Sequence, residues 1–218
     1  MYANRLSLII HTLCLMRELL ESNHYMIRKK LLKILGEKFH IYSDDTQKNL
    51  IGYSYQKALK LKEDIRVYTD ESESEEIMRI KARNIMDLSG KYDFTDSKTG
   101  ESLGGITRHL RKSLFQDSYS IYDQDNQVYG EIKEDSLFKS LIRRLPIPFM
   151  SLVFPQVFSM NVQGHSSITF TQKMNPMIQK LTVQIPDENQ FDRRVVLGAA
   201  MIVIAIEGKQ GVGLPVFS

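Results

Sequence analysis

The sequence contains a single cysteine, Cys14, and no tryptophan, and it has six prolines in 218 residues. One thiol cannot form an internal disulfide, which favours a reducing compartment, so we expect a cytoplasmic protein. The formal charge of +3 is too small to indicate a nucleic-acid partner. The five histidines are scattered without a zinc spacing, and neither a nucleophile elbow nor a phosphate-binding loop is present. We therefore expect no metal, no cofactor and no catalytic residues.

Long hydrophobic runs are also lacking, and the most apolar stretch is too short for a membrane span. Between Val195 and Ile206 no side chain is polar or charged. As a helix this stretch would rise roughly 18 Å, against roughly 30 Å of hydrocarbon in a bilayer. A helix that is apolar all round must be surrounded by protein. We therefore predict a buried helix over about 190–207, with a turn and an N-cap supplied by 186–189 and a C-cap at Gly208.

The N-terminal residues carry apolar side chains at helical spacing, from Leu6 to Leu20. No small-residue cleavage site follows the apolar run from Leu6 to Met16, so we do not interpret it as a signal peptide. We expect a helix that packs on the rest of the chain, although pairing with a partner or contact with a membrane would fit the same pattern. Cys14 lies in this run and is expected to be packed rather than reactive.

A strand–turn–strand pattern repeats through the middle of the chain, and its polar turns are typical of β-hairpins. Four copies start at Phe39, Ile65, Tyr92 and Tyr119. A fifth hairpin spans Phe158 to Gln172, and single strands are expected over 26–34 and 181–185. Twelve strands fit a closed barrel, because closure removes the sheet edges and a ring of this size leaves room for a slender helix.

The opening MIRKKLLKILGEKFHIYSDD, the hairpin YSIYDQDNQVYGEIKE and the terminal DRRVVLGAAMIVIAIEG resemble the tubby-like superfamily, most of all its LURP-one-related (LOR) branch, which is related to the phospholipid scramblases. The resemblance implies a mainly β fold, a closed twelve-stranded antiparallel barrel around a buried hydrophobic C-terminal helix. It also implies a non-enzymatic binding or scaffold module with a lipid head group or a protein as its partner. The alternatives are a scramblase-like membrane-surface protein and, least favoured, an enzyme.

We divide the chain into an N-terminal helical extension over 1–25, a tubby-like barrel domain over 26–208 and a flexible tail over 209–218. The distance from the fourth to the fifth hairpin exceeds the repeat period, which indicates an insert at about 134–155. The insert reads EDSLFKSLIRRLPIPFMSLVFP, and we expect a short amphipathic helix followed by an apolar loop.

Two basic segments form the candidate binding site for an anionic head group. Their residues are Arg108, Arg111, Lys112, Lys139, Arg143 and Arg144. A basic amphipathic helix beside an apolar loop can dock on an anionic lipid surface, which would place the protein peripherally at the membrane without a transmembrane span. In the plainer interpretation, the apolar face of the insert closes one end of the barrel and the cations face water.

Overall fold

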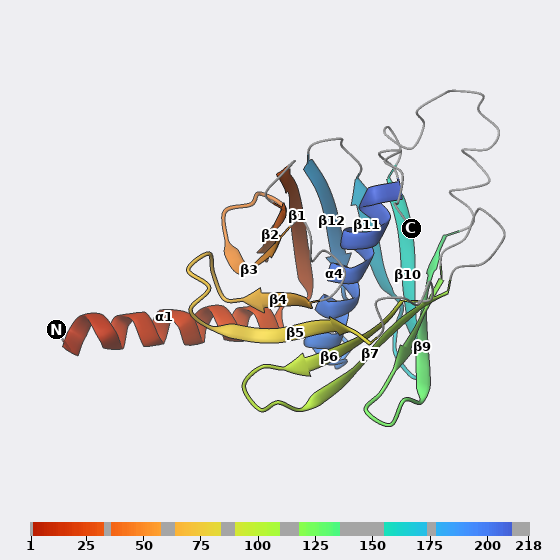
Figure 1. Ribbon diagram of the computed structural model, residues 1–218, viewed down its shortest axis with the longest axis horizontal. Helices are drawn as coiled ribbons and strands as arrows, with labels where there is room; N and C mark the ends of the chain where they lie inside the picture. Colours follow the sequence, from red (N-terminus) through yellow and green to blue (C-terminus); the bar gives the residue numbers. More distant parts are fainter. Residues whose placement is uncertain are drawn as a thin grey trace.

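We describe the fold from a computed structural model, which covers residues 2–32, 36–57, 64–83, 90–109, 118–135, 155–173 and 178–210. Within these residues lie two helices and twelve strands (Figure 1). They are α1 (Tyr2–Glu21), β1 (His24–Leu32), β2 (Gly36–Tyr42), β3 (Leu50–Lys57), β4 (Asp64–Tyr68), β5 (Glu76–Ala82), β6 (Lys91–Asp96), β7 (Ser102–His109), β8 (Ser118–Tyr122), β9 (Val128–Glu134), β10 (Gln156–Val162), β11 (Ile168–Lys173), β12 (Ile178–Gln184) and α4 (Arg193–Gln210).

The twelve strands close into one antiparallel barrel. Strands that follow one another in the chain pair along the whole sheet, and β1 also pairs with β12, which completes the ring. The predicted twelve-stranded barrel is therefore confirmed. The five expected hairpins correspond to β2–β3, β4–β5, β6–β7, β8–β9 and β10–β11, and the two single strands are β1 and β12.

One aspartate organises each of the four repeated turns. The carboxylates of Asp44, Asp70, Asp96 and Asp123 accept backbone N–H groups of their own turns at 2.7–2.9 Å. Such a bond lets a short polar side chain replace a backbone partner and tighten the turn. The repeat in the sequence therefore reflects a repeated turn chemistry as well as a repeated strand pattern.

Alternation along the strands decides which side chains face the barrel interior. In β6, Tyr92 and Phe94 are buried, whereas their neighbours Lys91 and Asp93 are only half-buried. Successive side chains of a strand point to opposite faces, so one face of each strand supplies the interior. These inward side chains and those of α4 belong to one hydrophobic core cluster.

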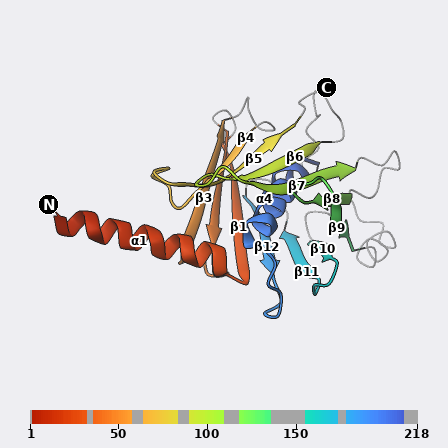
Figure 2. The ribbon, with the colours of Figure 1, turned by 90° about the horizontal axis from the view of Figure 1, so that it is seen from below.

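Among the described elements, α4 is the most completely buried. From Val195 to Ala205 no side chain is more than 5% exposed. The helix contacts β7, β12 and α1, and in both ribbon views it lies among the strands (Figure 2). A Cβ added to Gly198 would lie 2.8 Å from Cε2 of Phe94 on β6, so at this point the helix approaches the barrel wall closely. Neither described helix is long and apolar enough to cross a bilayer.

Both ends of α4 differ from the prediction. The N-cap is Asp192, whose Oδ1 accepts the backbone N–H of Arg194 at 2.9 Å. Asn189 lies before this cap, and its side-chain amide donates to the carbonyl of Ser166 at 3.0 Å. The helix also passes Gly208 and ends at Gln210, so the predicted C-cap at Gly208 is wrong. A glycine inside a helix lowers helix stability by only about 1 kcal/mol relative to alanine, so the helix can continue through Gly208.

A buried ion pair links β1, β2 and α4. The ammonium group of Lys29 lies 3.1 Å from a carboxylate oxygen of Glu37 and donates to the carbonyls of Ile204 and Ala205 at 3.3 Å each. Lys29 is fully buried, and Glu37 is 3% exposed. A buried charge is tolerated only with such partners. The contact therefore ties the C-terminal half of α4 to the wall formed by β1 and β2.

The second half of α1 packs against the barrel. Leu15 and Leu19 are buried in the common core, and the Tyr25 hydroxyl donates to the Leu19 carbonyl at 2.6 Å. The first half extends away from the barrel in both ribbon views, and Ile10 is 60% exposed there. Leu13, just beyond the middle of α1, is 54% exposed. The N-terminal helix is thus joined to the barrel core through its C-terminal turns.

Cys14 is exposed, which corrects the expectation that it is packed. At 100° per residue, the helix directs Leu15 and Leu19 toward the barrel. Position 14 then faces the opposite side of α1. Apolar spacing alone could not reveal which side of this helix meets the barrel, because both sides carry apolar residues.

Candidate functional site

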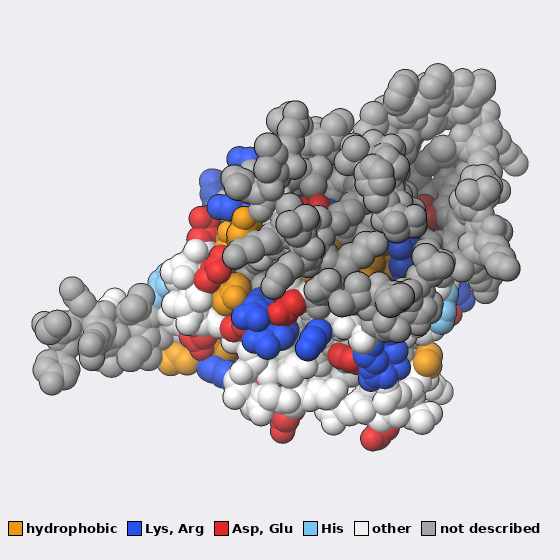
Figure 3. All heavy atoms as spheres, in the orientation of Figure 1, with side chains coloured by type: hydrophobic (Ala, Val, Ile, Leu, Met, Phe, Trp, Pro, Cys, Tyr) orange, Lys and Arg blue, Asp and Glu red, His pale blue; other side chains and the backbone are white. Residues whose placement is uncertain are grey.

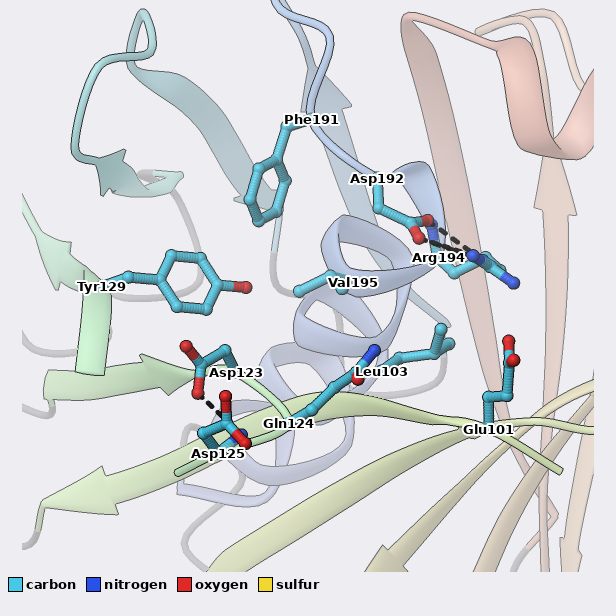
Figure 4. Close-up of a pocket in the computed structure, with 10 residues that line it drawn as sticks. All are labelled: Glu101, Leu103, Asp123, Gln124, Asp125, Tyr129, Phe191, Asp192, Arg194 and Val195. Carbon is cyan, nitrogen blue, oxygen red and sulfur yellow. Dashed lines mark hydrogen bonds and ion pairs between the residues drawn. The ribbon is translucent and has the colours of Figure 1, made fainter. Parts of the chain in front are cut away.

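A pocket of about 360 Å³ opens where α4 begins (Figure 4). Its walls come from three places that are distant in the chain: the β6–β7 hairpin, the β8–β9 hairpin and the segment that leads into α4. Leu103 and Val195 lie at its centre in the close-up and provide an apolar floor. The fold therefore assembles this pocket from hairpin ends around the first turn of the buried helix.

Aromatic rings form one wall of the pocket. The rings of Tyr129 and Phe191 are 5.8 Å apart between centroids, and His165 supports Phe191 edge-on at 5.6 Å. In the close-up the Tyr129 hydroxyl points toward the middle of the pocket. Burial raises the pKa of Tyr129 to about 12, and the nearby charges of Asp123 and Asp192 act in the same direction. The phenol is therefore neutral at physiological pH.

Four carboxylates surround this wall and floor. They belong to Glu101, Asp123, Asp125 and Asp192. In the close-up, Asp123 and Asp125 lie on the side of Tyr129, and Asp192 and Glu101 lie on the side of Arg194. Together with the single guanidinium they give the lining a formal charge of −3. The pocket is thus acidic on two sides and apolar between them.

Two of these carboxylates are held in place by the backbone. Asp123 accepts the N–H groups of Asp125 at 2.9 Å and Gln127 at 2.8 Å, which fixes the β8–β9 turn. Asp192 caps α4 through the N–H of Arg194. Backbone hydrogen bonds orient a carboxylate without removing its charge. Both groups therefore present fixed negative charge to the pocket.

Arg194 holds two carboxylates at the edge of the pocket. Its side chain contacts Asp192 at 2.7 Å through Nη2 and also pairs with Asp96. Burial would raise the pKa of the Asp96 carboxyl, but backbone hydrogen bonds from Thr99 and Lys98 and the charge of Arg194 bring it below its usual value. Hydrogen bonding to Asp192 in turn raises the pKa of Arg194. The guanidinium is therefore a permanent cation that pairs with Asp192.

Such a lining suits an organic cation. A guanidinium or ammonium group above an aromatic ring gains about 0.5–2 kcal/mol, depending on how far it is removed from water. Carboxylates close by add Coulomb attraction and charged hydrogen bonds. The apolar floor would receive the aliphatic stem that carries the charge. Among the described residues, no three His, Cys, Asp or Glu side chains lie together so as to hold a metal ion.

Of the six basic residues of the predicted head-group site, the structure describes Arg108, which does not line the pocket. Arg111, Lys112, Lys139, Arg143 and Arg144 fall outside the described residues, as does the insert except for its ends. Arg108 stands opposite Tyr119 on the β7–β8 ladder, and its Nε atom is buried. The head-group site at these six residues stays a prediction.

The described barrel face in Figure 3 is electrically mixed. Basic and acidic side chains lie side by side on it. On β4, Arg66 pairs with Asp64 at 3.0 Å, and Arg83 after β5 pairs with Asp93 at 2.8 Å. Ion pairs of this kind neutralise the field of each cation, so this part of the barrel presents no uniform positive surface.

Sequence reasoning missed the pocket, because its residues are distant in the chain and only closure of the barrel brings them together. Two local signals were available. The Asp-rich turn of the fourth hairpin contains Asp123 and Asp125, and Asp192 stands immediately before the apolar helix, as an N-cap does. Nothing in the sequence indicated that these two signals would meet beside Tyr129.

Comparison with known proteins identifies one family. A family model described as LURP-one-related (LOR) matches residues 50–203, which is most of the chain and runs from β3 into α4. Comparisons with curated proteins and with solved structures found no match. The tubby-like superfamily is consistent with this family and with the closed twelve-stranded barrel. The chain belongs to the LURP-one-related family.

Proposed function

We propose that this protein is a non-enzymatic binding module whose pocket at the start of α4 receives a lysine or arginine side chain of a protein partner. The observation that carries the proposal is the lining itself, with carboxylates on two sides of an aromatic wall and an apolar floor. A formal charge of −3 attracts a cation and repels an anionic head group.

The roles of the carboxylates support binding rather than catalysis. Asp123 and Asp192 each accept backbone N–H groups through one carboxylate oxygen, and these bonds fix a turn and a helix end. A general acid or base needs a proton-transfer partner and a pKa close to the working pH. The Tyr129 phenol, with its pKa raised to about 12, also stays far from that range. The pocket thus offers fixed charge and ring faces for recognition.

The test is titration with a short alanine peptide that carries one central arginine, followed by NMR and calorimetry. We expect saturable shifts at Tyr129, Phe191 and Val195 and a dissociation constant in the roughly millimolar to high-micromolar range. Binding should weaken as salt is added, because the attraction is screened. A lysine peptide should bind as well, and a glutamate peptide should not.

Matched variants locate the site. Asparagine forms the same turn as aspartate, so Asp123→Asn combined with Asp125→Asn removes charge and keeps the hairpin. This double variant should weaken arginine-peptide binding about tenfold. Glu131→Gln removes one charge from the same hairpin away from the pocket, beside Lys133, and should leave binding nearly unchanged. If the glutamate peptide binds as well as the arginine peptide, the pocket does not select cations and the proposal fails.

The lipid alternative rests on the six basic residues from Arg108 to Arg144. Under it, the protein sediments with anionic liposomes and not with neutral ones, and neutralising Lys139, Arg143 and Arg144 abolishes the difference. A scramblase-like role in which α4 leaves the barrel to enter a membrane would have to break the buried contact between Lys29 and α4, so this contact disfavours it.

The single exposed thiol of Cys14 fits a reducing compartment, and we propose the cytoplasm.

A further inference from the structure

Arg194 stands where a bound cation would interact with Asp192. Its Nη2 lies 2.7 Å from Asp192 Oδ2, its Nε lies 3.1 Å from Oδ1, and its Nη1 pairs with Asp96. The guanidinium therefore uses both oxygens of the carboxylate that caps α4. Within the lining it is the one positive group among four negative ones.

We propose that Arg194 is an internal competitor that sets the affinity of this pocket for cations, by occupying Asp192 and Asp96 until a partner's side chain takes its place. The inference rests on the proposed function, since it concerns regulation of the same site. In the free protein, the Arg194 guanidinium would thus block the Asp192 side of the pocket to other cations.

The exposure of the pair makes exchange of partners inexpensive. The side chains of Arg194 and Asp192 are 27% and 38% exposed, so water can solvate both groups when they separate. The side chain of Asp96 is only 12% exposed, but it keeps the backbone N–H groups of Lys98 and Thr99 when the guanidinium leaves. Partly exposed ion pairs contribute little net stability. Asp192 would still cap α4, because that bond uses the backbone N–H and not the guanidinium. The helix end can thus stay in place while the Arg194 side chain moves.

The neighbouring arginine provides the matched control. Arg193 donates to the Phe191 carbonyl at 2.8 Å and also to the side chain of Asn23, and its guanidinium makes no hydrogen bond or ion pair with the Asp192 or Asp96 carboxylate. Arg193→Gln and Arg194→Gln therefore remove the same charge from the same helical turn. Only the second change frees the two carboxylates. A difference between them reports the specific pairing rather than the net charge.

The test compares the affinity of the arginine peptide for the full chain and these variants at low salt. Arg194→Gln should bind about tenfold more tightly, the effect of removing one like charge from the vicinity of the ligand. Arg193→Gln should differ from the wild-type protein by less than about twofold. Equal or weaker binding by Arg194→Gln, with wild-type binding intact, overturns the inference and leaves the proposed function standing. If neither protein binds the peptide, both proposals fail.

A measurement without substitutions covers the case in which Arg194→Gln does not fold. The Nε–H resonances of Arg193 and Arg194 are followed in the wild-type protein during the same titration. We expect the Arg194 signal to shift and to exchange faster with water as the peptide saturates, while the Arg193 signal stays in place. An Arg194 signal that stays unchanged at saturation means that the peptide does not displace it, and the inference is then wrong.

Discussion

Lys29 on β1 donates a hydrogen bond from its ammonium group to the carbonyl oxygen of Ile204 in α4, at 3.3 Å and out of contact with water. The helix contributes a backbone acceptor and the barrel contributes the charge. Glu37 on β2 balances that charge at 3.1 Å. The interior of this protein therefore contains a directional, charged contact in addition to apolar packing, and this contact ties α4 to β1 and β2.

Replacing Lys29 with methionine should destabilise the protein by roughly 3–5 kcal/mol, because the Glu37 carboxylate would stay buried without its cation. Combining Lys29→Met with Glu37→Leu should recover much of the loss, since no buried charge is left over. Urea unfolding of the two variants measures both effects. A loss below about 1 kcal/mol in the single variant would show that Lys29 reaches water and does not hold α4.

The substitution Gly198→Ala tests whether α4 is buried or exposed, because its effect on the free energy of unfolding has opposite signs in the two cases. Against Phe94, whose ring would lie 2.8 Å from the new methyl group, the added carbon should destabilise the fold by about 1–3 kcal/mol. On an exposed helix the same change would stabilise by about 1 kcal/mol, because alanine is the better helix former. Thermal and urea unfolding measure the sign. In a Phe94→Leu background the cost should become smaller, as a double-mutant cycle would reveal.

Stability should fall as the pH rises above about 10, the usual pKa of tyrosine. The pKa of Tyr129 is raised to about 12, and burial raises those of Tyr25 and Tyr122 further. Between these values the unfolded chain loses protons that the folded protein keeps, so unfolding becomes more favourable with increasing pH. Below about pH 10 these groups are protonated in both states and contribute no pH dependence.

Ultraviolet absorbance of tyrosinate, read together with unfolding at each pH, checks this expectation. Tyr129→Phe should remove one late-titrating group and reduce the loss of stability between pH about 10 and 12. If every tyrosine ionises near pH 10 while the fold persists, the phenols are not buried as described.

The fold followed from the sequence wherever a pattern was local. The Asp-rich turns, such as the one that starts at Asp123, marked hairpins because a carboxylate that binds its own turn is a property of adjacent residues. The apolar stretch from Val195 indicated a helix that needs cover on every side. The barrel then followed from the count of strands, because unpaired edges had to be removed.

Features that depend on distant residues could not be predicted in the same way. Lys29 reads as an ordinary cation in a basic strand segment, and only the pairing of β1 with β2 brings Glu37 to it. The Cys14 side of α1 looked as apolar as the side that packs. The pocket needed the β8–β9 turn with Asp123 and the start of α4 with Asp192 to line one surface. The basic runs of the sequence instead predicted a site at Arg108 and in the insert.

Whether the strands enclose α4 decides both the fold and the position of the pocket, and native-state hydrogen exchange measures it most directly. Amides from Leu197 to Ile204 should exchange only through global unfolding, with the same opening free energy and the same dependence on urea as the unfolding transition. Exchange of these amides with a much smaller free energy and almost no dependence on urea would contradict the account, because α4 would then open without the barrel.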